Sequence, residues 1–294
     1  MKIKQYGAGY IDEIKKPLII DEQIALLNFS EASSHINSVI ANKKQMGCME
    51  FNLNEFLEIL KNDNLKEMIL IITLHWGYER IILPSEKQIE LAHQLIDLGV
   101  DLVIGHHPHI IQPYEVYKGK YIFYSLGNYF FPNYYGYKSG IYYEWNKLNC
   151  YSIIITVEIQ DNKKLNISFE GLEFNNKQFK LDFNPIGKTL LIKYSNLLAR
   201  LNKKENYDSI FRKYLQKFYF SDKKSTLLSI IINFYSVFSL FKKNKYSFIH
   251  RIKRIISFKR IGYFLKLLSD KNNWFNYNQH AMIELIDKIL NFSN

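Results

Sequence analysis

Cysteine is scarce in this chain, since its 294 residues include only Cys48 and Cys150. Two cysteines cannot build a disulfide framework, and their separation leaves no CxxC pair. A reducing compartment is the simplest inference. The first residues carry two lysines but no apolar stretch behind them, so no secretion signal is visible. We therefore expect the protein in the cytoplasm or at the inner face of the membrane.

Long apolar runs are also lacking. The uncharged segment 226–241 is shorter than the roughly 20 residues that span a bilayer, which favours a buried helix over a membrane-embedded one. The following segment, 246–268, mixes basic residues with Ile, Phe and Tyr. It is either a solvated basic helix face or a surface that lies on an anionic membrane or an acidic polymer. Peripheral membrane contact through residues 226–268 is therefore one expectation.

Acidic residues are few in the C-terminal part of the chain. Residues 188–294 contain 21 Lys and Arg against 6 Asp and Glu, whereas residues 1–187 contain 18 against 22. This asymmetry indicates two regions with different partners, and an anionic polymer suits the basic one. We place the boundary near residue 187, after which the pattern becomes helical. No nucleic-acid reader motif accompanies the basic residues, so we expect no specific nucleic acid.

The N-terminal region predicts a βαβ unit. Residues 68–74 form a continuous apolar run of the length and β-branched content that a buried strand has. A helix opens at Ser85, with Gln88 three residues later as in a capping box, and Gly99 supplies its end. The next strand is 100–104, and we expect the two strands to be parallel with a right-handed crossover.

Other segments complete an α/β prediction. We expect a helix over 54–66 and a hairpin of strands 153–159 and 165–174, and the further strands predicted are 17–29, 121–126 and 179–183. The predicted architecture is an α/β domain over residues 1–187, followed by a basic, aromatic-rich, all-α region over 188–294.

Histidines gather where the two strands of the βαβ unit end. The chain has 8 histidines, and His75 follows the first strand while His106, His107 and His109 follow the second. In open α/β sheets ligands bind outside the carboxyl ends of the strands, so these side chains should meet at one edge. Neutral imidazole binds Zn, Mn or Fe. A divalent transition metal or a phosphate is therefore the leading interpretation, and a hydrogen-bonded corner of the fold is the alternative.

The spacing of the cluster suggests which histidines would be ligands. His107 and His109 are two residues apart, and Pro108 favours an extended His107, so the two side chains should point the same way. We predict His75, His107 and His109 as the metal ligands. His106 points the other way in that register, so it is a candidate for contact with substrate or with a neighbouring strand, and a catalytic role for it stays open.

Several segments together resemble a known family. They are LHWGYE (74–79), PSEKQ (84–88), DLVIGHHPHIIQPYEVYKGKYIFYSLGNYFF (101–131) and an opening GAG. Over about residues 5–185 the chain resembles the CapA-type proteins of poly-γ-glutamate capsule synthesis, which belong to the calcineurin-like metallophosphoesterase superfamily. The resemblance implies a layered sandwich, in which packed sheets are flanked by helices and a di-metal site lies at the strand ends.

The resemblance also implies roles for individual residues. His75 would be the lone histidine ligand of one superfamily motif, and His107 and His109 would be the final H-x-H ligands. Glu79 and Asn128 would be rim residues that bind substrate, although a surface charge and a turn explain them equally well. One or two divalent ions (Mn, Zn or Fe) are implied as cofactors.

The chain departs from the family pattern at its start. The Asp-bearing G-D motif, the N-L-E segment and the N-N-H motif do not occur in it. A two-metal site needs a bridging carboxylate between cations about 3.5–4 Å apart, whereas three histidines can hold one Zn with an open position. We therefore expect an incomplete domain that lacks the N-terminal part, and an upstream polypeptide is the expected source of the missing ligands.

Two functional hypotheses follow. The first is a metal-dependent hydrolase-like protein of capsule or surface-polymer biosynthesis, acting on a phosphorylated or polymeric substrate, with catalysis by the chain alone left open. The second is a non-catalytic member of the family that binds an anionic polymer or a membrane surface as an assembly factor.

Overall fold

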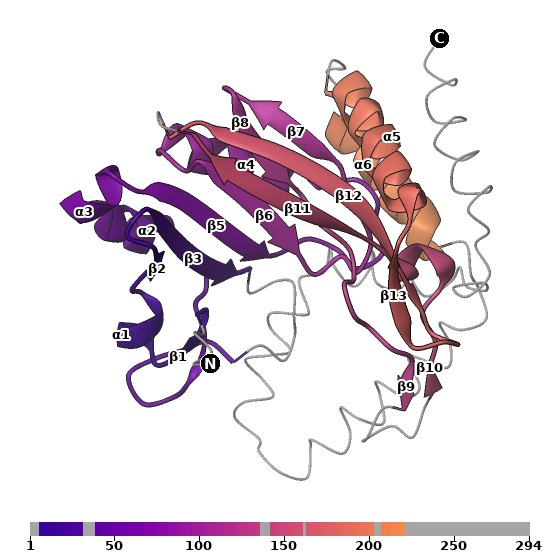
Figure 1. Ribbon diagram of the computed structural model, residues 1–294, viewed down its shortest axis with the longest axis horizontal. Coiled ribbons are helices and arrows are strands. Elements are labelled where there is room, and N and C mark those ends of the chain that lie inside the picture. Colours follow the sequence, from indigo (N-terminus) through magenta and orange to yellow (C-terminus); the bar gives the residue numbers. More distant parts are fainter. Residues whose placement is uncertain (1–5, 32–38, 136–141, 161–162, 203–206, 221–294) are drawn as a thin grey trace, which may run out of the picture. The chain divides into compact units, whose positions relative to one another are not determined.

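The computed structural model describes residues 6–31, 39–135, 142–160, 163–202 and 207–220 (Figure 1). The chain divides into two units, Met1–Tyr207 and Asp208–Asn294. All the candidate site residues belong to the first unit. The described part of the second unit is helix α6 (Tyr207–Phe220), whose first residue belongs to the first unit.

A six-stranded mixed sheet is the centre of the first unit. Its strand order is β2-β3-β5-β6-β8-β7. The bounds are β2 Leu18–Ile20, β3 Ile24–Ser30, β5 Ile69–His75, β6 Leu102–His106, β7 Tyr114–Tyr117 and β8 Lys120–Phe123. The four inner strands are parallel, while β2 and β7 pair antiparallel at the two edges. Such a sheet places the carboxyl ends of β3, β5 and β6 at one edge, where the candidate residues follow.

The βαβ prediction is confirmed. Every residue of β5 before His75 is buried, as expected of a strand covered on both faces. Helix α4 (Glu86–Asp97) begins with the capping box, in which Ser85 Oγ accepts from the Gln88 N–H at 3.2 Å and Gln88 Oε1 accepts from the Ser85 N–H at 2.9 Å. Gly99 follows the helix with φ +103°, a conformation that favours glycine. Strand β6 then pairs parallel with β5.

Two predicted segments are each divided in the structure. The strand expected over 17–29 is a hairpin, because Asp21 and Glu22 adopt left-handed backbone conformations (φ 48° and 57°) and reverse the chain between β2 and β3. The helix expected over 54–66 is two helices, α2 (Leu53–Leu60) and α3 (Asp63–Lys66). The second starts afresh because Asn62 caps it, accepting from the Asn64 N–H.

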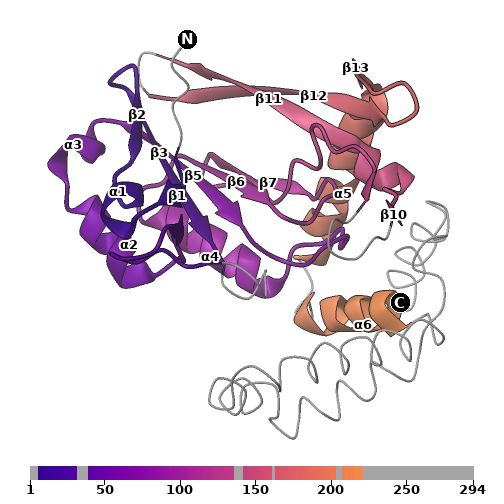
Figure 2. The same ribbon diagram turned by 90° about the horizontal axis from the view of Figure 1, so that it is seen from below.

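A three-stranded antiparallel sheet forms a second layer. It consists of β11 (Tyr151–Ile159), β12 (Leu165–Asn175) and β13 (Lys180–Phe183), in that order, which confirms the predicted hairpin and its third strand. Figure 2 shows this layer on one side of the large sheet and helices α2 and α4 on the other. The chain thus has the layered α/β architecture that the resemblance implies.

Helix α5 (Pro185–Leu201) packs against β11 and β12 and also reaches the large sheet. Ser195 Oγ on α5 accepts from the Tyr114 N–H of β7 at 2.9 Å. The first unit therefore continues past residue 187, where the sequence suggests a boundary, and extends to Tyr207. Five smaller elements complete the description: β1 Ala8–Gly9, α1 Ile11–Ile14, β4 Gly47–Cys48, β9 Tyr134–Tyr135 and β10 Tyr142–Tyr143, with a 3-10 turn at Lys147–Cys150.

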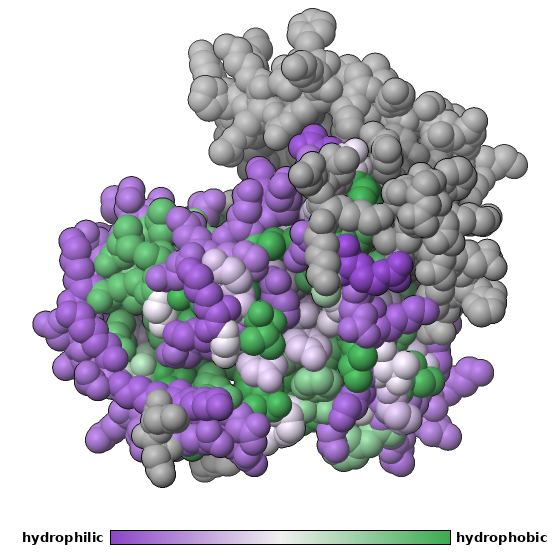
Figure 3. All heavy atoms as spheres, turned by 90° about the horizontal axis from the view of Figure 1, so that it is seen from above, coloured by the Kyte–Doolittle hydropathy of each residue, from purple (hydrophilic) through white to green (hydrophobic). Residues whose placement is uncertain are grey.

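Among the described residues, no helix is both long enough and apolar enough to cross a membrane. The basic segment 226–268 lies outside the described residues. On the face seen in Figure 3, hydrophobic and hydrophilic side chains are intermixed over the described part of the chain.

Candidate metal centre

The sheet register brings the histidine-bearing strand ends side by side. His75 is the last residue of β5 and lies opposite His106, the last residue of β6. On the other side of β5, Ser30 of β3 lies opposite His75, and the Glu31 N–H donates to the His75 carbonyl oxygen at 2.9 Å. The expectation that residues about thirty positions apart meet at one edge is therefore correct.

Beyond β6 the backbone turns sharply. The sequence favours an extended His107, but His107 has φ 97° and His109 has φ 57°, so that prediction is wrong. Non-glycine residues occupy this region at an energetic cost and are enriched at functional sites. Between them, the Pro108 carbonyl oxygen accepts from the Arg80 N–H at 2.7 Å. This bond ties the turn to the 76–80 loop, which carries Glu79.

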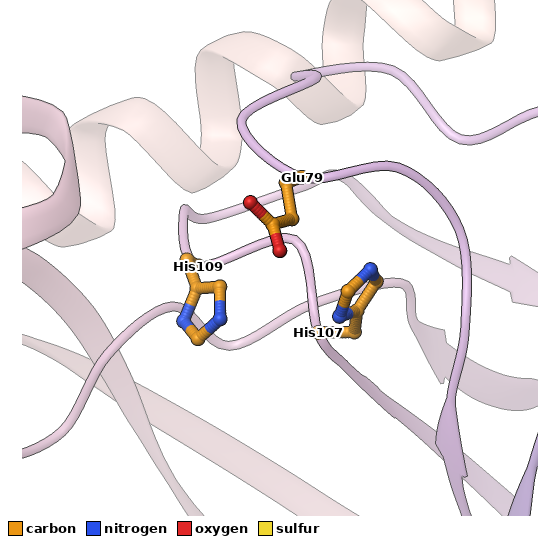
Figure 4. Close-up of side chains that lie close together, drawn as sticks. All are labelled: Glu79, His107 and His109. Atoms are coloured by element: carbon orange, nitrogen blue, oxygen red, sulfur yellow. The ribbon is translucent and has the colours of Figure 1, made fainter. Parts of the chain in front are cut away.

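Glu79, His107 and His109 converge on one point (Figure 4). One ligand atom from each lies within 4.8 Å of the others, and Figure 4 shows the Glu79 carboxylate between the two imidazole rings. His107 is buried and His109 half-buried, whereas Glu79 is exposed. Ligand atoms on one Zn ion lie at most about 4.2 Å apart, since each bond is about 2.0–2.2 Å. The three side chains would therefore draw together slightly to hold one ion.

The donor set fits a divalent transition metal. Two imidazoles and one carboxylate occur in catalytic zinc sites and in non-haem iron sites, both of which keep positions open for water or substrate. A single carboxylate and two imidazoles hold one ion. They do not include the additional bridging ligands that a second ion requires.

His75 lies next to this cluster. Its ring centroid is 4.5 Å from that of His107, and the two rings are tilted by 47°. The structure thus groups His107 and His109 with Glu79, for which the resemblance implies a substrate contact, and places His75 against His107. A ligand role for His75 stays a prediction.

Asn128 contacts the imidazole ring of His109. It is buried, and its Oδ1 lies 2.9 Å from His109 Nδ1. An amide oxygen only accepts, so His109 Nδ1 carries the proton and Nε2 is left with a lone pair for a metal. The carbonyl oxygen of His109 accepts from Asn149 Nδ2 at 2.7 Å. The structure therefore places Asn128 in contact with a candidate ligand, which is a different setting from the substrate rim that the resemblance implies.

Part of the chain is similar to known capsule synthesis proteins. The family model of the bacterial capsule synthesis protein PGA_cap matches residues 1–133, which include every predicted site residue. Residues 1–133 are therefore similar to this family. The PGA biosynthesis protein CapA of Bacillus subtilis (strain 168) is 35% identical over 130 residues, which cover 42% of this chain and 34% of that protein. The capsule biosynthesis protein CapA of Bacillus anthracis is 38% identical over 113 residues, covering 37% and 27%.

A third relative matches a shorter segment. The probable polyglutamine synthesis accessory protein Rv0574c of Mycobacterium tuberculosis (strain ATCC 25618 / H37Rv) is 40% identical over 60 residues, 20% of this chain and 16% of that protein. The chain thus matches about a third or less of the length of these capsule-synthesis relatives.

Two further groups lie at the candidate site. The side chain of His106 is exposed, yet crowding by the surrounding protein lowers its pKa, and the neighbouring His75 lowers it further. Glu31, which sequence reasoning missed, accepts from the Gly77 N–H at 3.2 Å and so holds the loop that follows His75. Its signal in the sequence is its position directly after β3, at the same edge as the histidines.

An aromatic wall borders His109, and sequence reasoning missed it too. The ring centroids of Phe131 and Trp145 each lie 5.2 Å from that of His109. The guanidinium carbon of Arg80 lies 5.7 Å from the centre of the Trp145 ring. Trp145 lies beyond the residues that match the family model. Its contact with His109 is therefore visible only in the folded structure.

Histidine 93 belongs to a different setting. The sequence suggests a surface residue, and the side chain of His93 is 28% exposed. Its Nε2 lies 2.9 Å from Glu115 Oε1, which also accepts from the Tyr124 hydroxyl at 2.5 Å. His35, His250 and His280 lie outside the described residues.

Proposed function

We propose that this protein acts in the synthesis of a bacterial capsule or surface polymer as a metal-dependent hydrolase-like domain. The observation that carries the proposal is the convergence of Glu79, His107 and His109 within a segment that matches the family model of a capsule synthesis protein. Related proteins are named for the biosynthesis of PGA, of capsule and of polyglutamine, which supports a polymer-related role.

In this proposal the chain's own residues hold and orient a divalent ion of Mn, Zn or Fe. Glu79, His107 and His109 supply the ligand atoms, and Asn128 fixes the tautomer of His109. His75 packs against His107 and is the further ligand that we propose. When bound, such an ion supplies Lewis acidity toward a phosphoester or a related polar bond. His106, exposed at the end of β6, is the proposed proton-transfer residue.

Two-metal chemistry would require additional carboxylate and amide ligands. A second polypeptide is the source that we propose for them. Co-expression with a protein that carries the G-D, N-L-E and N-N-H motifs would then raise both the number of bound ions and the rate of phosphoester hydrolysis.

The experiment that tests the proposal measures metal binding and hydrolysis on the full chain. Wild-type protein should bind Zn²⁺ or Mn²⁺ in a calorimetric titration and hydrolyse a general phosphoester such as p-nitrophenyl phosphate. His107→Ala should lose both properties, and the matched control His93→Gln should keep both. Metal affinity that is equal in wild type and His107→Ala would show that this cluster is not the metal site.

A non-catalytic role is the second candidate, and the charge distribution favours it. Residues 188–294 carry 21 basic against 6 acidic residues, although most of this region lies outside the described residues. A polyanion or an anionic membrane surface, contacted through residues 226–268 from the cytoplasmic side, is the proposed partner. Competition between poly-γ-glutamate, anionic vesicles and DNA identifies it, and preferential displacement by DNA would contradict this candidate.

A further inference from the structure

Arg80 stands beside the candidate metal centre and is fixed at both ends. At its backbone, the N–H donates to the carbonyl oxygen of Pro108, the residue between His107 and His109. The left-handed φ of 61° at Arg80 is uncommon for a side chain of this size, so tertiary contacts hold it in this conformation. The start of the side chain is therefore anchored to the histidine-bearing turn itself.

At its other end, the guanidinium faces an aromatic ring that also borders the site. Its central carbon lies 5.7 Å from the centre of the Trp145 ring, within the range of a cation–π interaction. Trp145 is itself held, because its Nε1–H donates to the Pro132 carbonyl oxygen and its N–H donates to Asn133 Oδ1. The same indole lies 5.2 Å from the His109 ring. Arg80 and the candidate metal ligand His109 thus lie near the same indole ring.

The charges at the site indicate what this arrangement would recognise. A divalent ion adds two positive charges and Arg80 adds one, whereas Glu79 contributes one negative charge. Glu31 at the same edge contributes a second negative charge, so these groups sum to one positive charge, which an anionic substrate group offsets. The guanidinium is planar, so its N–H donors lie in one plane, the arrangement that matches a phosphate or a carboxylate through two parallel hydrogen bonds.

We propose that Arg80 binds an anionic group, a phosphate or a carboxylate, of the substrate that the Glu79–His107–His109 centre acts on. This inference rests on the proposed function and narrows the substrate to molecules with such a group near the reacting bond. Arg80 serves to position the substrate and contributes nothing to metal binding.

The test measures anion binding and metal binding separately on the full chain. Calorimetric titrations use Zn²⁺ first, and then inorganic phosphate and glutarate as the two anion probes on the zinc-loaded protein. The variants are Arg80→Gln, which removes the charge, and Arg80→Lys, which keeps the charge but loses the planar fork. Arg200→Gln on α5 is the matched control, since Arg200 is an exposed arginine in the last turn of that helix.

We expect Arg80→Gln to weaken binding of the preferred anion by about tenfold or more, as the loss of a charged hydrogen-bond partner does. Arg80→Lys should fall between Arg80→Gln and wild type. Zinc affinity should stay within about twofold of wild type in every Arg80 variant, because Arg80 has no ligand atom for a cation. A preference for phosphate would indicate a phosphoester substrate, and a preference for glutarate would indicate a glutamate polymer.

Two results would overturn the inference and are distinguishable from each other. If zinc-loaded wild type binds neither anion, or binds both as tightly as Arg80→Gln does, the role of Arg80 is wrong while the metal centre stands. If wild type binds no metal, the proposed function fails and this inference fails with it. Arg80→Lys, the more conservative variant, keeps the test decisive should Arg80→Gln not fold.

Discussion

At the scale of single residues, the candidate centre depends on backbone conformations that few side chains adopt. His107, His109 and Arg80 all have positive φ, and all three lie in the two loops that meet beside Pro108. Each left-handed non-glycine residue costs of order 1 kcal/mol or more, and surrounding contacts must offset that cost. Asn128 and Asn149 supply two such contacts to His109.

Asn128→Ala should therefore weaken zinc binding by about 10- to 100-fold, because loss of the partner that orients a ligand has effects of that size. Asn128→Asp should retain most of the affinity, since a carboxylate also accepts from His109 Nδ1. Calorimetric titration measures both. Asn62→Ala, which removes the cap of α3 instead, is the matched control and should bind zinc as wild type does. Equal affinities in Asn128→Ala and Asn62→Ala would refute the orienting role.

Gly105 is a second residue at which a larger side chain does not fit. A Cβ at this position would lie 1.9 Å from the Tyr124 carbonyl oxygen and 2.3 Å from Trp76 Nε1, two atoms that are hydrogen-bonded to each other at 3.0 Å. Gly105→Ala should lower the free energy of unfolding by about 3 kcal/mol or more, since backbone cannot yield to overpacking. Urea titration measures the change. Gly119→Asn, at an open turn position with φ 79°, should cost less than about 1 kcal/mol.

At the scale of elements, local chemistry explains which predictions succeeded. Helix α4 could be predicted because its capping box and terminal glycine lie within the sequence of the helix itself. The β2–β3 hairpin was missed because Asp21-Glu22 contains no glycine or asparagine, the strongest signals for a two-residue turn, and the flanking residues are apolar on both sides. The centre was partly predictable: strand ends place His75, His107 and His109 at one edge. The grouping of Glu79, Arg80 and Trp145 depends on loops that no periodicity describes.

Ser85 offers a test of that local chemistry. Ser85→Ala removes the oxygen that accepts from the Gln88 N–H, and it should lower the free energy of unfolding by about 1 kcal/mol. Ser85→Asp keeps an acceptor at the start of the helix and should be close to wild type. Urea titrations measure both variants. An unchanged free energy of unfolding in Ser85→Ala would show that the cap contributes nothing, and equal destabilisation by both would show that the acceptor oxygen is not the cause.

At the scale of the whole molecule, the proposed metal binding would be coupled to folding. Since the cluster joins the loop after β5 to the turn after β6, an ion held there links two segments that separate on unfolding. A ligand that binds only the folded state at 100 times its Kd stabilises that state by about 2.7 kcal/mol. Zinc at that concentration should therefore raise the unfolding midpoint of wild type, as measured by circular dichroism.

His107→Ala is the control for this coupling. Its unfolding midpoint should be insensitive to zinc, while the midpoint of His93→Gln should rise as wild type does. A midpoint that rises equally in His107→Ala would place the stabilising ion elsewhere in the chain.

The register that sets His75 opposite His106 also limits how this chain can change in length. Side chains alternate between the two faces of a strand. One residue inserted within β6 would therefore move every side chain on one side of the insertion to the opposite face of the sheet. Two inserted residues would restore the faces but shift the histidine-bearing turn by about 6–7 Å relative to Glu79. Insertions and deletions in related chains should therefore fall in the loops away from this edge, and the spacing from Leu102 to His109 should be the most uniform length in the domain.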